Sequence, residues 1–374
     1  MADVRPLRAV RYAEPLEAVV APPYDVLDEE QVAAYAARSP HNVVRLTRPG
    51  ADYEGSARRF REWLDAGVLV EDSEPAMYVH ETAFDGRVRR DLLAALRLQP
   101  YSDRVVLPHE RTHRGPKEDR LALLRASGVS YEPLWFLAEH VAALLDAAPA
   151  GEATAFAYGE ERHTLRRIAD PAWITSVTEA FAERPALIAD GHHRYETALA
   201  YAEELGGPPD SAARYTLALL TDLADDGLVV LPTHRLLRAG VAVTGGTPVA
   251  SLEDALAALR EGRASSATYR DGAFQLLDLE GDVPVLELHR QVVDNVLGRR
   301  SAEDGLAYTR DAAQAVRWVD EGTGVAAFLL GPPDLGAVLR LAESGMTMPQ
   351  KSTYFAPKPP SGMAFHRLRP DQPM

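Results

Sequence analysis

An acid, a glycine, two histidines and an arginine follow one another in the stretch ALIADGHHRYETALAYAEELGG, residues 186–207. The apolar run before them is typical of a buried strand, and Tyr195–Leu205 has the composition of a helix that ends at a glycine pair. A strand-to-helix turn presents free backbone N–H groups and the positive end of a helix dipole, which suits a phosphate. The residues at this predicted turn are Asp190, Gly191, His192, His193 and Arg194.

Each of these residues also has a simpler interpretation. Asp190 could cap the helix, Gly191 could serve only the turn geometry, and the histidines could be surface residues. The five together favour a binding site, in which Gly191, His192, His193 and Arg194 hold a phosphate.

Lysine is rare in this chain, with three lysines against 37 arginines. A position that keeps lysine is one where the compact ammonium group of lysine suits the structure better than the wide planar guanidinium of arginine. Lys117 lies in PHERTHRGPKEDRL, and Lys351 and Lys358 lie in MPQKSTYFAPKPPSG. We assign Lys117 to the phosphate site, and the second segment to substrate binding through Lys351, Ser352, Thr353 and Tyr354.

Cationic and hydroxyl groups around helix N-termini suit phosphoryl transfer, which also needs a carboxylate as base. Glu110, beside His109, could take a proton from an attacking hydroxyl. A capping or salt-bridging role for Glu110 fits its local sequence equally well. Asp190 is better suited to a structural or Mg²⁺-binding role, because a carboxylate at the turn repels phosphate.

Two weaker candidates complete the set. Tyr24 and Asp25 lie on a stiff Pro-Pro loop and could line a pocket, although a turn residue is the simpler interpretation of Asp25. The pairs His109/His113 and His192/His193 could form a metal site, but adjacent histidines rarely reach one ion. The sequence lacks the common phosphate-loop, dinucleotide, zinc-protease and serine-hydrolase motifs.

Composition limits the class of protein. The chain has 374 residues, of which 46% are hydrophobic and 25% charged, and it lacks cysteine. No apolar run or leader segment indicates membrane insertion or export, so we expect a cytoplasmic protein. The net charge of −15 disfavours nucleic acid as a partner and leaves a nucleotide and a small-molecule substrate. The oligomeric state cannot be predicted.

The pattern of elements predicts a mixed α/β fold in three parts, with bounds 1–100, 101–240 and 241–374. In the first part we expect a helix capped by Asp28, a strand over His41–Leu46 and a hairpin around Asp85-Gly86. In the middle part we expect a hairpin over 154–168, a helix over 172–183, and two paired strands over 214–223 and 228–231.

In the third part the expected order is a helix from Ser251, a hairpin at Asp271-Gly272, helices over 290–297 and 310–320, a strand over 325–330 and a helix over 334–343. The Pro-rich tail is predicted to be an ordered loop and strand that returns to the body of the protein, because it carries several large apolar side chains.

Four separated blocks resemble the signature of a bacterial and archaeal family, the domain of unknown function 1015. The blocks are APPYDV at 21–26, PHE-x-T-x3-PKEDRLxLL at 108–124, ADGHHRYETAL at 189–199 and MPQKSTYFxPK at 348–358. The similarity runs from about residue 5 to residue 368.

The Asp-Gly-His-His-Arg turn is also distantly similar to the phosphate-binding turn of the ParB/sulfiredoxin-like superfamily, which includes free L-serine kinases. This resemblance implies a ParB/sulfiredoxin-like core with an inserted hairpin and helix and added N- and C-terminal α/β lobes. It implies Glu110, in a Pro-His-Glu context, as the base, and Mg²⁺ with ADP or ATP as cofactors.

The expected activity is therefore a nucleotide-dependent phosphotransferase, acting as kinase, in reverse or as phosphatase, with serine or O-phosphoserine as the first candidate substrate. A nucleotide-binding regulatory protein with slow NTPase activity is the alternative. DNA binding of the ParB type is disfavoured by the charge.

Overall fold

The computed structural model describes residues 2–112, 114–182, 184–240, 245–294 and 305–374, without the side chains of 114–116. The chain divides into two compact units. Unit 1 comprises Met1–Pro108, Thr112–Leu228 and Pro357–Met374. Unit 2 comprises His109–Arg111 and Val229–Ala356. Most of the Pro-rich tail therefore belongs to unit 1, whereas His109–Arg111, from the block that begins with PHE at residue 108, belong to unit 2.

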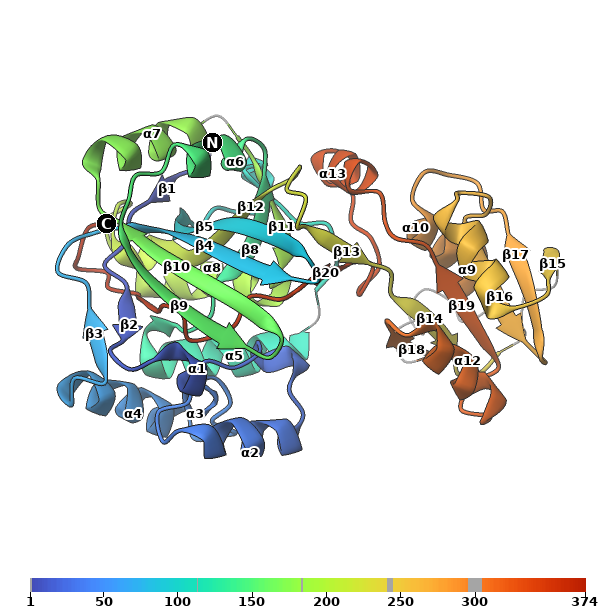
Figure 1. The fold of residues 1–374 in the computed structure, drawn as a ribbon, viewed down its shortest axis with the longest axis horizontal. Coiled ribbons are helices and arrows are strands. Elements are labelled where there is room, and N and C mark those ends of the chain that lie inside the picture. Colours follow the sequence, from blue (N-terminus) through green and yellow to red (C-terminus); the bar gives the residue numbers. More distant parts are fainter. Residues whose placement is uncertain (1, 113, 183, 241–244, 295–304) are drawn as a thin grey trace. The chain divides into compact units, whose positions relative to one another are not determined.

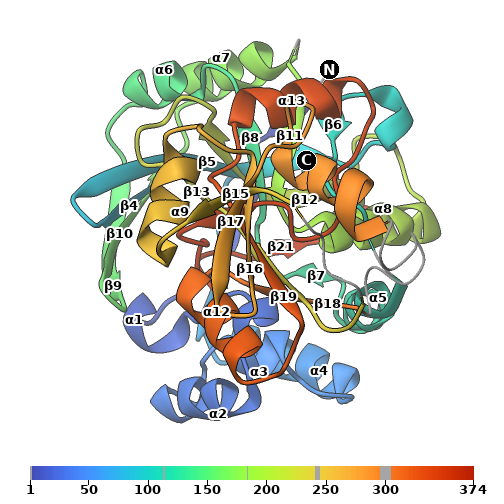
Figure 2. The same ribbon diagram turned by 90° about the vertical axis from the view of Figure 1, so that its right-hand side faces the viewer.

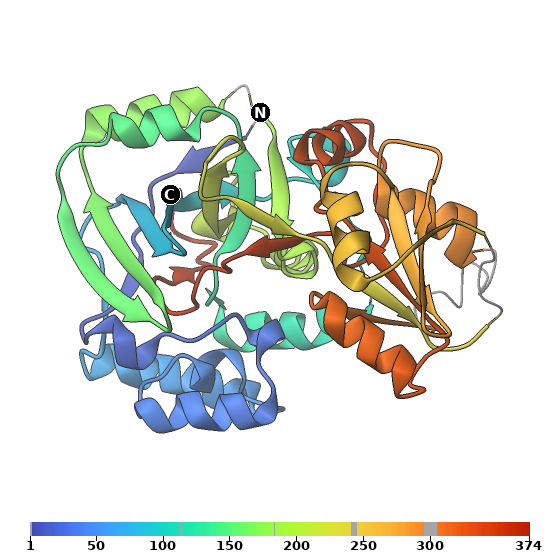
Figure 3. The same ribbon diagram turned by 45° about the vertical axis from the view of Figure 1, so that its right-hand side comes forward.

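Unit 1 is built on a nine-stranded mixed sheet with the order β6-β11-β8-β12-β5-β4-β10-β9, in which β1 also pairs with β5. The pairs β6–β11 and β8–β12 are parallel, and the others are antiparallel. The β9–β10 hairpin ends the sheet at one edge (Figure 3). The strands of this sheet are β1 Val4–Arg5, β4 Met77–Phe84, β5 Arg87–Arg97, β6 Val106–Leu107, β8 Leu134–Ala138, β9 Glu152–Tyr158, β10 Glu161–Ile168, β11 Ala186–Asp190 and β12 Tyr215–Asp222.

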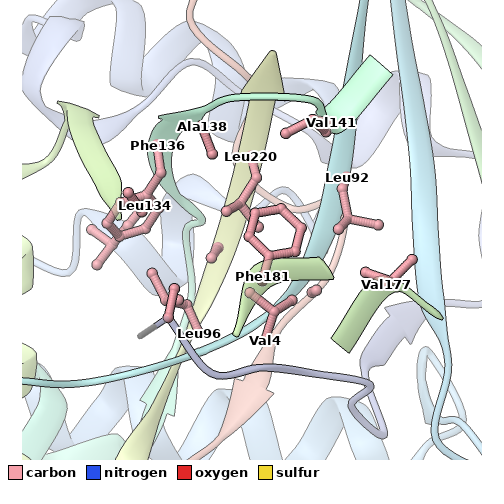
Figure 4. Packing of buried hydrophobic residues seen from close by; sticks show 14 of the residues in the cluster. Val4, Leu92, Leu96, Leu134, Phe136, Ala138, Val141, Val177, Phe181 and Leu220 are labelled. Carbon is pink, nitrogen blue, oxygen red and sulfur yellow. The ribbon is translucent and has the colours of Figure 1, made fainter. Parts of the chain in front are cut away.

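Helices cover this sheet and complete unit 1 (Figure 1). Apolar side chains of α6, α7 and α8 meet those of the central strands in one buried cluster, in which Phe136, Phe181 and Leu220 are fully buried (Figure 4). The helices are α1 Leu16–Val19, α2 Glu29–Arg38, α3 Val44–Thr47, α4 Tyr53–Asp65, α5 Arg114–Ser127, α6 Val141–Asp146, α7 Pro171–Phe181 and α8 His192–Leu205. Short 3₁₀ turns are η1 Tyr24–Val26, η2 Tyr101–Asp103 and η3 Ala212–Arg214, and two small pairs join β2 Val10–Tyr12 to β3 Leu69–Glu71 and β7 Val129–Ser130 to β21 His366–Arg367.

Unit 2 is a smaller α/β unit with a six-stranded sheet in the order β15-β17-β16-β19-β14-β18. Helices α9 and α12 lie against the sheet that contains β16 and β19 (Figure 2). Apolar side chains of these four elements form one buried cluster. A separate pair joins β13 to β20. The elements are β13 Val229–Leu231, β14 His234–Leu237, β15 Thr247–Val249, α9 Leu252–Arg260, β16 Ser266–Arg270, β17 Ala273–Leu277, α10 Pro284–Leu288, the π-helical turn η4 His289–Val293, β18 Leu306–Thr309, α12 Ala312–Asp320, β19 Ala326–Leu330, α13 Leu335–Glu343 and β20 Tyr354–Ala356.

The mixed α/β class is confirmed, and so are several local predictions. Asp28 forms a capping box with Gln31, in which each side chain accepts a hydrogen bond from the other residue's N–H at 2.8 and 3.0 Å. The hairpins at Asp85-Gly86 and Asp271-Gly272 join β4 to β5 and β16 to β17. Within the described ranges, no helix is both long and apolar enough to cross a membrane.

Two predictions of secondary structure are wrong. His41–Leu46 is not a strand, because Val44–Thr47 forms the short helix α3, whose start is held by the Asn42 side chain accepting from the Val44 N–H at 3.1 Å. A single turn of helix is too short to show helical periodicity.

The predicted pairing of residues 214–223 with 228–231 is also wrong. The strand β12 lies between β5 and β8, and β13 pairs with β20. Gly227 does not form a hairpin turn. It allows the backbone to pass close to Arg89, since a Cβ at Gly227 would lie 2.5 Å from the backbone N of Arg89.

The helix expected at 290–297 begins as the π-helical turn η4, and residues 295–297 lie outside the described part of the chain.

Candidate functional site

The turn from β11 to α8 depends on Gly191. Its φ of +100° is a conformation that side chains with a Cβ rarely adopt, and a Cβ would lie 2.8 Å from Cδ2 of Leu134. Gly191 is the N-cap of α8, and a glycine has no side chain that could cap the helix. The first turn of α8 therefore directs backbone N–H groups and the positive end of its dipole into the turn.

Five charged side chains of unit 1 gather at this turn, and we call them the Lys358 cluster: Asp25, Glu132, Asp190, Arg194 and Lys358. Lys358 Nζ lies 2.8 Å from Asp25 Oδ2 and 2.7 Å from Asp190 Oδ1. Arg194 donates to Asp190 Oδ2 at 2.8 Å. The cluster joins residues more than 330 positions apart in the chain.

Burial makes this arrangement costly unless the charges compensate one another. Burial alone would raise the pKa of Asp190, but the charges of Lys358 and Arg194 outweigh it and hold that pKa well below its usual range. Burial alone would lower the pKa of Lys358, and the carboxylates of Asp190 and Asp25 instead raise it. Asp190 and Lys358 therefore stay ionised at neutral pH.

Glu132 ties the cluster to the N-terminal loop. Its Oε1 accepts hydrogen bonds from the Tyr24 backbone N–H at 2.9 Å and from the Ser361 hydroxyl at 2.7 Å. Arg194 donates to the Pro133 carbonyl at 2.8 Å and lies 3.9 Å from Glu132 Oε2. Burial raises the pKa of Tyr24 to about 12, so its phenol remains protonated.

The two histidines of the turn differ in their surroundings. His192 is buried, with an exposed fraction of 7%, and its charge is among those that lower the pKa of Asp190. His193 is partly exposed, and its carbonyl accepts a hydrogen bond from the Thr197 hydroxyl at 2.7 Å.

Lys117 is bound by an acid on α8. Glu196 of α8 accepts hydrogen bonds from Lys117 Nζ and, at 2.9 Å, from the Thr112 hydroxyl. This pair links α5 to α8 beside the turn. Lys117 is 30% exposed and Glu196 26%, so both remain in contact with solvent.

The remaining candidates lie in unit 2, where Glu110 is held by the loop that precedes β20. Its Oε1 accepts from the backbone N–H groups of Ser352 at 2.8 Å and Thr353 at 3.0 Å, and its Oε2 accepts from that of Lys351 at 3.0 Å. The Thr353 hydroxyl lies 3.2 Å from Oε1 and 2.8 Å from His109 Nε2. The sequence-predicted residues therefore fall into two groups, one in each unit.

Several residues of these groups were missed by the sequence analysis. Lys358 was placed on the returning tail without a role, and Glu132 and Ser361 had no signal in their local sequence. Arg235 of unit 2 is fully buried in β14. An arginine between the apolar residues of LPTHRLL was the available signal for it.

The proposed histidine metal site involves His113, which lies outside the described residues. Among the residues that are described, no group of three or more His, Asp or Glu side chains could hold a metal ion. Asp190 and Asp25, both bound to Lys358, are carboxylates that could still contribute to a Mg²⁺ bound mainly by a nucleotide.

The fold and these two groups of residues define a mixed α/β protein with a cluster of charged side chains in unit 1 and a carboxylate held by backbone N–H groups in unit 2. The chain belongs to the family described as "Protein of unknown function (DUF1015)", whose model matches residues 4–304. No curated protein matches it in sequence.

Three solved structures are similar in fold at low identity. A free serine kinase in complex with AMP is 15% identical, with 71% of this chain and 89% of that chain covered and a TM-score of 0.40. A conserved hypothetical protein from Pyrococcus furiosus is 16% identical, with 68% and 88% covered and a TM-score of 0.36. SbnI with a C-terminal truncation from Staphylococcus aureus is 12% identical, with 70% and 82% covered and a TM-score of 0.35. Likeness at this level does not assign an activity.

Proposed function

We propose that this protein is a nucleotide-dependent phosphotransferase acting on a small metabolite with a hydroxyl group, and that serine or O-phosphoserine is the first compound to test. The observation that carries the proposal is the Lys358 cluster at the start of α8. Replacing buried ion pairs by apolar side chains is often neutral or stabilising, so a cluster of this kind is weak evidence for stability. Groups with strongly shifted pKa values beside a helix N-terminus instead favour a functional site.

In this proposal the nucleotide's phosphates bind at the first turn of α8. The backbone N–H groups after Gly191 and the helix dipole attract the phosphate. Arg194 and Lys358 supply positive charge, and Lys117 adds a partly exposed ammonium. Because Arg194 and Lys358 already bind Asp190, the phosphate must compete with this carboxylate.

A Mg²⁺ ion would remove that competition. The five side chains of the Lys358 cluster carry one more negative than positive charge, which suits an added cation. Asp190 and Asp25 would hold the ion together with the nucleotide, since Mg²⁺ commonly combines one or two carboxylates with substrate phosphates. The ion would neutralise charge on the transferred group.

Glu110 would take the proton from the acceptor hydroxyl, with His109 orienting the neighbouring Thr353 hydroxyl. Ser352, Thr353 and Tyr354 would contact the substrate. With water as acceptor, the same residues would act as a phosphatase, and with ADP as acceptor they would run the transfer in reverse.

One observation favours the regulatory alternative. Hydrogen bonds to a carboxylate stabilise its charged form and lower its basicity, and Glu110 accepts bonds from three backbone N–H groups. A protein in which Glu110 stays locked in this way would bind a nucleotide and turn it over slowly.

Calorimetry with ADP and ATP in the presence of Mg²⁺, combined with chromatography of the nucleotides after incubation with serine, tests the proposal. Glu110→Gln should bind nucleotide as the wild type does and lose transfer. Arg194→Ala should weaken nucleotide binding. The control Arg125→Ala removes an exposed ion pair between Arg125 of α5 and Glu204 of α8, and it should leave nucleotide binding unchanged. Unchanged nucleotide affinity in Arg194→Ala would place the phosphate site elsewhere.

A further inference from the structure

The loop Lys351–Thr353 of unit 2 has the geometry of an anion-binding nest. Its three consecutive backbone N–H groups point at a single carboxylate, that of Glu110, over 2.8–3.0 Å. Lys351 has a left-handed φ of +53°, which turns successive N–H groups toward one point. The Thr353 hydroxyl adds a fourth donor at 3.2 Å.

A buried arginine lies behind this loop. Arg235 is 0% exposed and donates to the carbonyl oxygens of Thr233 and, at 3.0 Å, of Lys351. Its guanidinium lies over the Tyr308 ring, with Cζ 5.7 Å from the ring centroid. Within the described part of the chain, its Nε has no hydrogen-bond partner and no carboxylate forms an ion pair with it. Burial lowers the pKa of Arg235 to about 10, and Tyr308 and, to a smaller extent, Glu110 act in the opposite direction.

A buried histidine, His289, also experiences the positive charge of Arg235. His289 is 7% exposed, and its Nε2 has no partner among the described residues. Burial, followed by the charges of Arg235 and Arg111, lowers the pKa of His289 to about 3, so the imidazole is neutral. The surroundings of the nest are therefore positive, and they require one anion, which Glu110 now supplies.

We propose that the Lys351–Thr353 nest is a phosphate-binding site and that the Glu110 carboxylate is its resting occupant, displaced when a ligand's phosphate group binds there. A phosphate offers at least three acceptor oxygens for the three N–H groups and the hydroxyl, and it carries more charge than a carboxylate. The exposed ammonium of Lys351 would add to the attraction.

This exchange deepens the proposed function and rests on it in one respect, namely that Glu110 is the catalytic base. Bound in the nest, Glu110 is a poor base. Displaced by phosphate, it loses three hydrogen bonds and becomes a better one. The ligand of this site is therefore a phosphorylated compound, and its binding would activate Glu110. The competing interpretation is that Glu110 permanently anchors the loop.

Titration of the full-length protein with inorganic phosphate separates these interpretations. The readouts are calorimetry and the ¹⁵N–¹H resonances of Lys351, Ser352 and Thr353, which locate the binding. Glu110→Ala should bind phosphate at the nest about tenfold more tightly than the wild type, because its internal competitor is gone. Adding Thr353→Val should remove part of that gain.

Glu253→Ala, an exposed acid of the same unit, serves as the charge-matched control and should behave as the wild type. If Glu110→Ala binds phosphate no better than this control, or if the three amide resonances do not move, the exchange is refuted. Should Glu110→Ala fail to fold, phosphate titrated into the wild type must shift the same amides and the Glu110 side-chain ¹³C resonance, and no shift refutes the exchange.

These outcomes are independent of the proposed activity. Phosphate binding at the nest in a protein that transfers no phosphoryl group would support the exchange and refute the phosphotransferase. Phosphoryl transfer without any shift of the nest amides would support the phosphotransferase and refute the exchange.

Discussion

Replacing Lys358 with methionine should destabilise unit 1 strongly, because Lys358 compensates two carboxylates at once. Its ammonium lies 2.7 Å from Asp190 and 2.8 Å from Asp25, and the side chains of Lys358 and Asp190 are only 10% and 20% exposed. Removing one partner of a buried ion pair typically costs about 3–5 kcal/mol. The partial exposure of Asp25, at 41%, places the expected loss near the lower end, at about 3 kcal/mol.

Urea unfolding followed by tryptophan fluorescence measures this loss. Three of the four tryptophans, Trp63, Trp135 and Trp173, lie in unit 1. With a urea dependence of about 3 kcal/mol per M for a unit of this size, the midpoint should fall by about 1 M. Lys117→Met is the matched control, since its partly exposed ion pair should contribute about 1 kcal/mol or less.

The pH dependence gives a second check on the same variant. The pKa of Asp190 is lowered in the folded state, so its ion pairs contribute stability above about pH 4 and lose it as the pH falls through the folded pKa. Protonated Asp190 needs no counter-charge, so the difference between Lys358→Met and the wild type should shrink in acid. A midpoint change below about 0.3 M at pH 7, or a difference that grows in acid, would refute this account of the cluster.

Three further outcomes are expected. Gly191→Ala should destabilise unit 1 by about 2 kcal/mol in the same urea assay, since the left-handed backbone and Leu134 both oppose a Cβ; a neutral effect would mean that the turn can relax. Asp91→Asn should cost about 3 kcal/mol, because Arg89, fully buried and 3.0 Å from Asp91, would lose its charge partner; an unchanged midpoint would contradict this. The NMR chemical shift of His289 should show a neutral imidazole at pH 5. The free energy of unfolding of the wild type should decline from about pH 6.5 toward pH 3, because the unfolded state takes up the proton on His289 first. This one group should contribute up to about 1.4 kcal/mol per pH unit to the decline. A His289→Gln variant should lose this part of the decline.

The features that the sequence predicted correctly depend on neighbouring residues. The capping box at Asp28, the hairpins at Asp85-Gly86 and Asp271-Gly272, and the turn at Gly191 each need only a few consecutive positions. The strand β12 shows the limit, since its partners β5 and β8 come from distant segments and the nearby Gly227 imitates a hairpin turn. Strand pairing of this kind is decided by tertiary packing, to which local propensity gives no access.

The same limit applies to the site. Asp25, Asp190 and Arg194 were selected for their types and local setting, and the structure gathers them in the Lys358 cluster. Tyr24 lies beside it, since its backbone N–H donates to Glu132. Lys358 could not be matched to Asp190 from sequence, because a buried charge finds its partner through the fold. Arg235 is a further example, because the structure alone shows that it is buried and that, among the described residues, no carboxylate forms an ion pair with it.

Phosphorus NMR tests the central claim most directly. The protein is incubated with Mg²⁺ and either ATP or ADP together with serine, and separately with O-phosphoserine and ADP. The proposal predicts the appearance or loss of the phosphoserine resonance in step with the nucleotide signals, and no such change with Glu110→Gln. The absence of any turnover, together with no nucleotide binding by calorimetry, would contradict it.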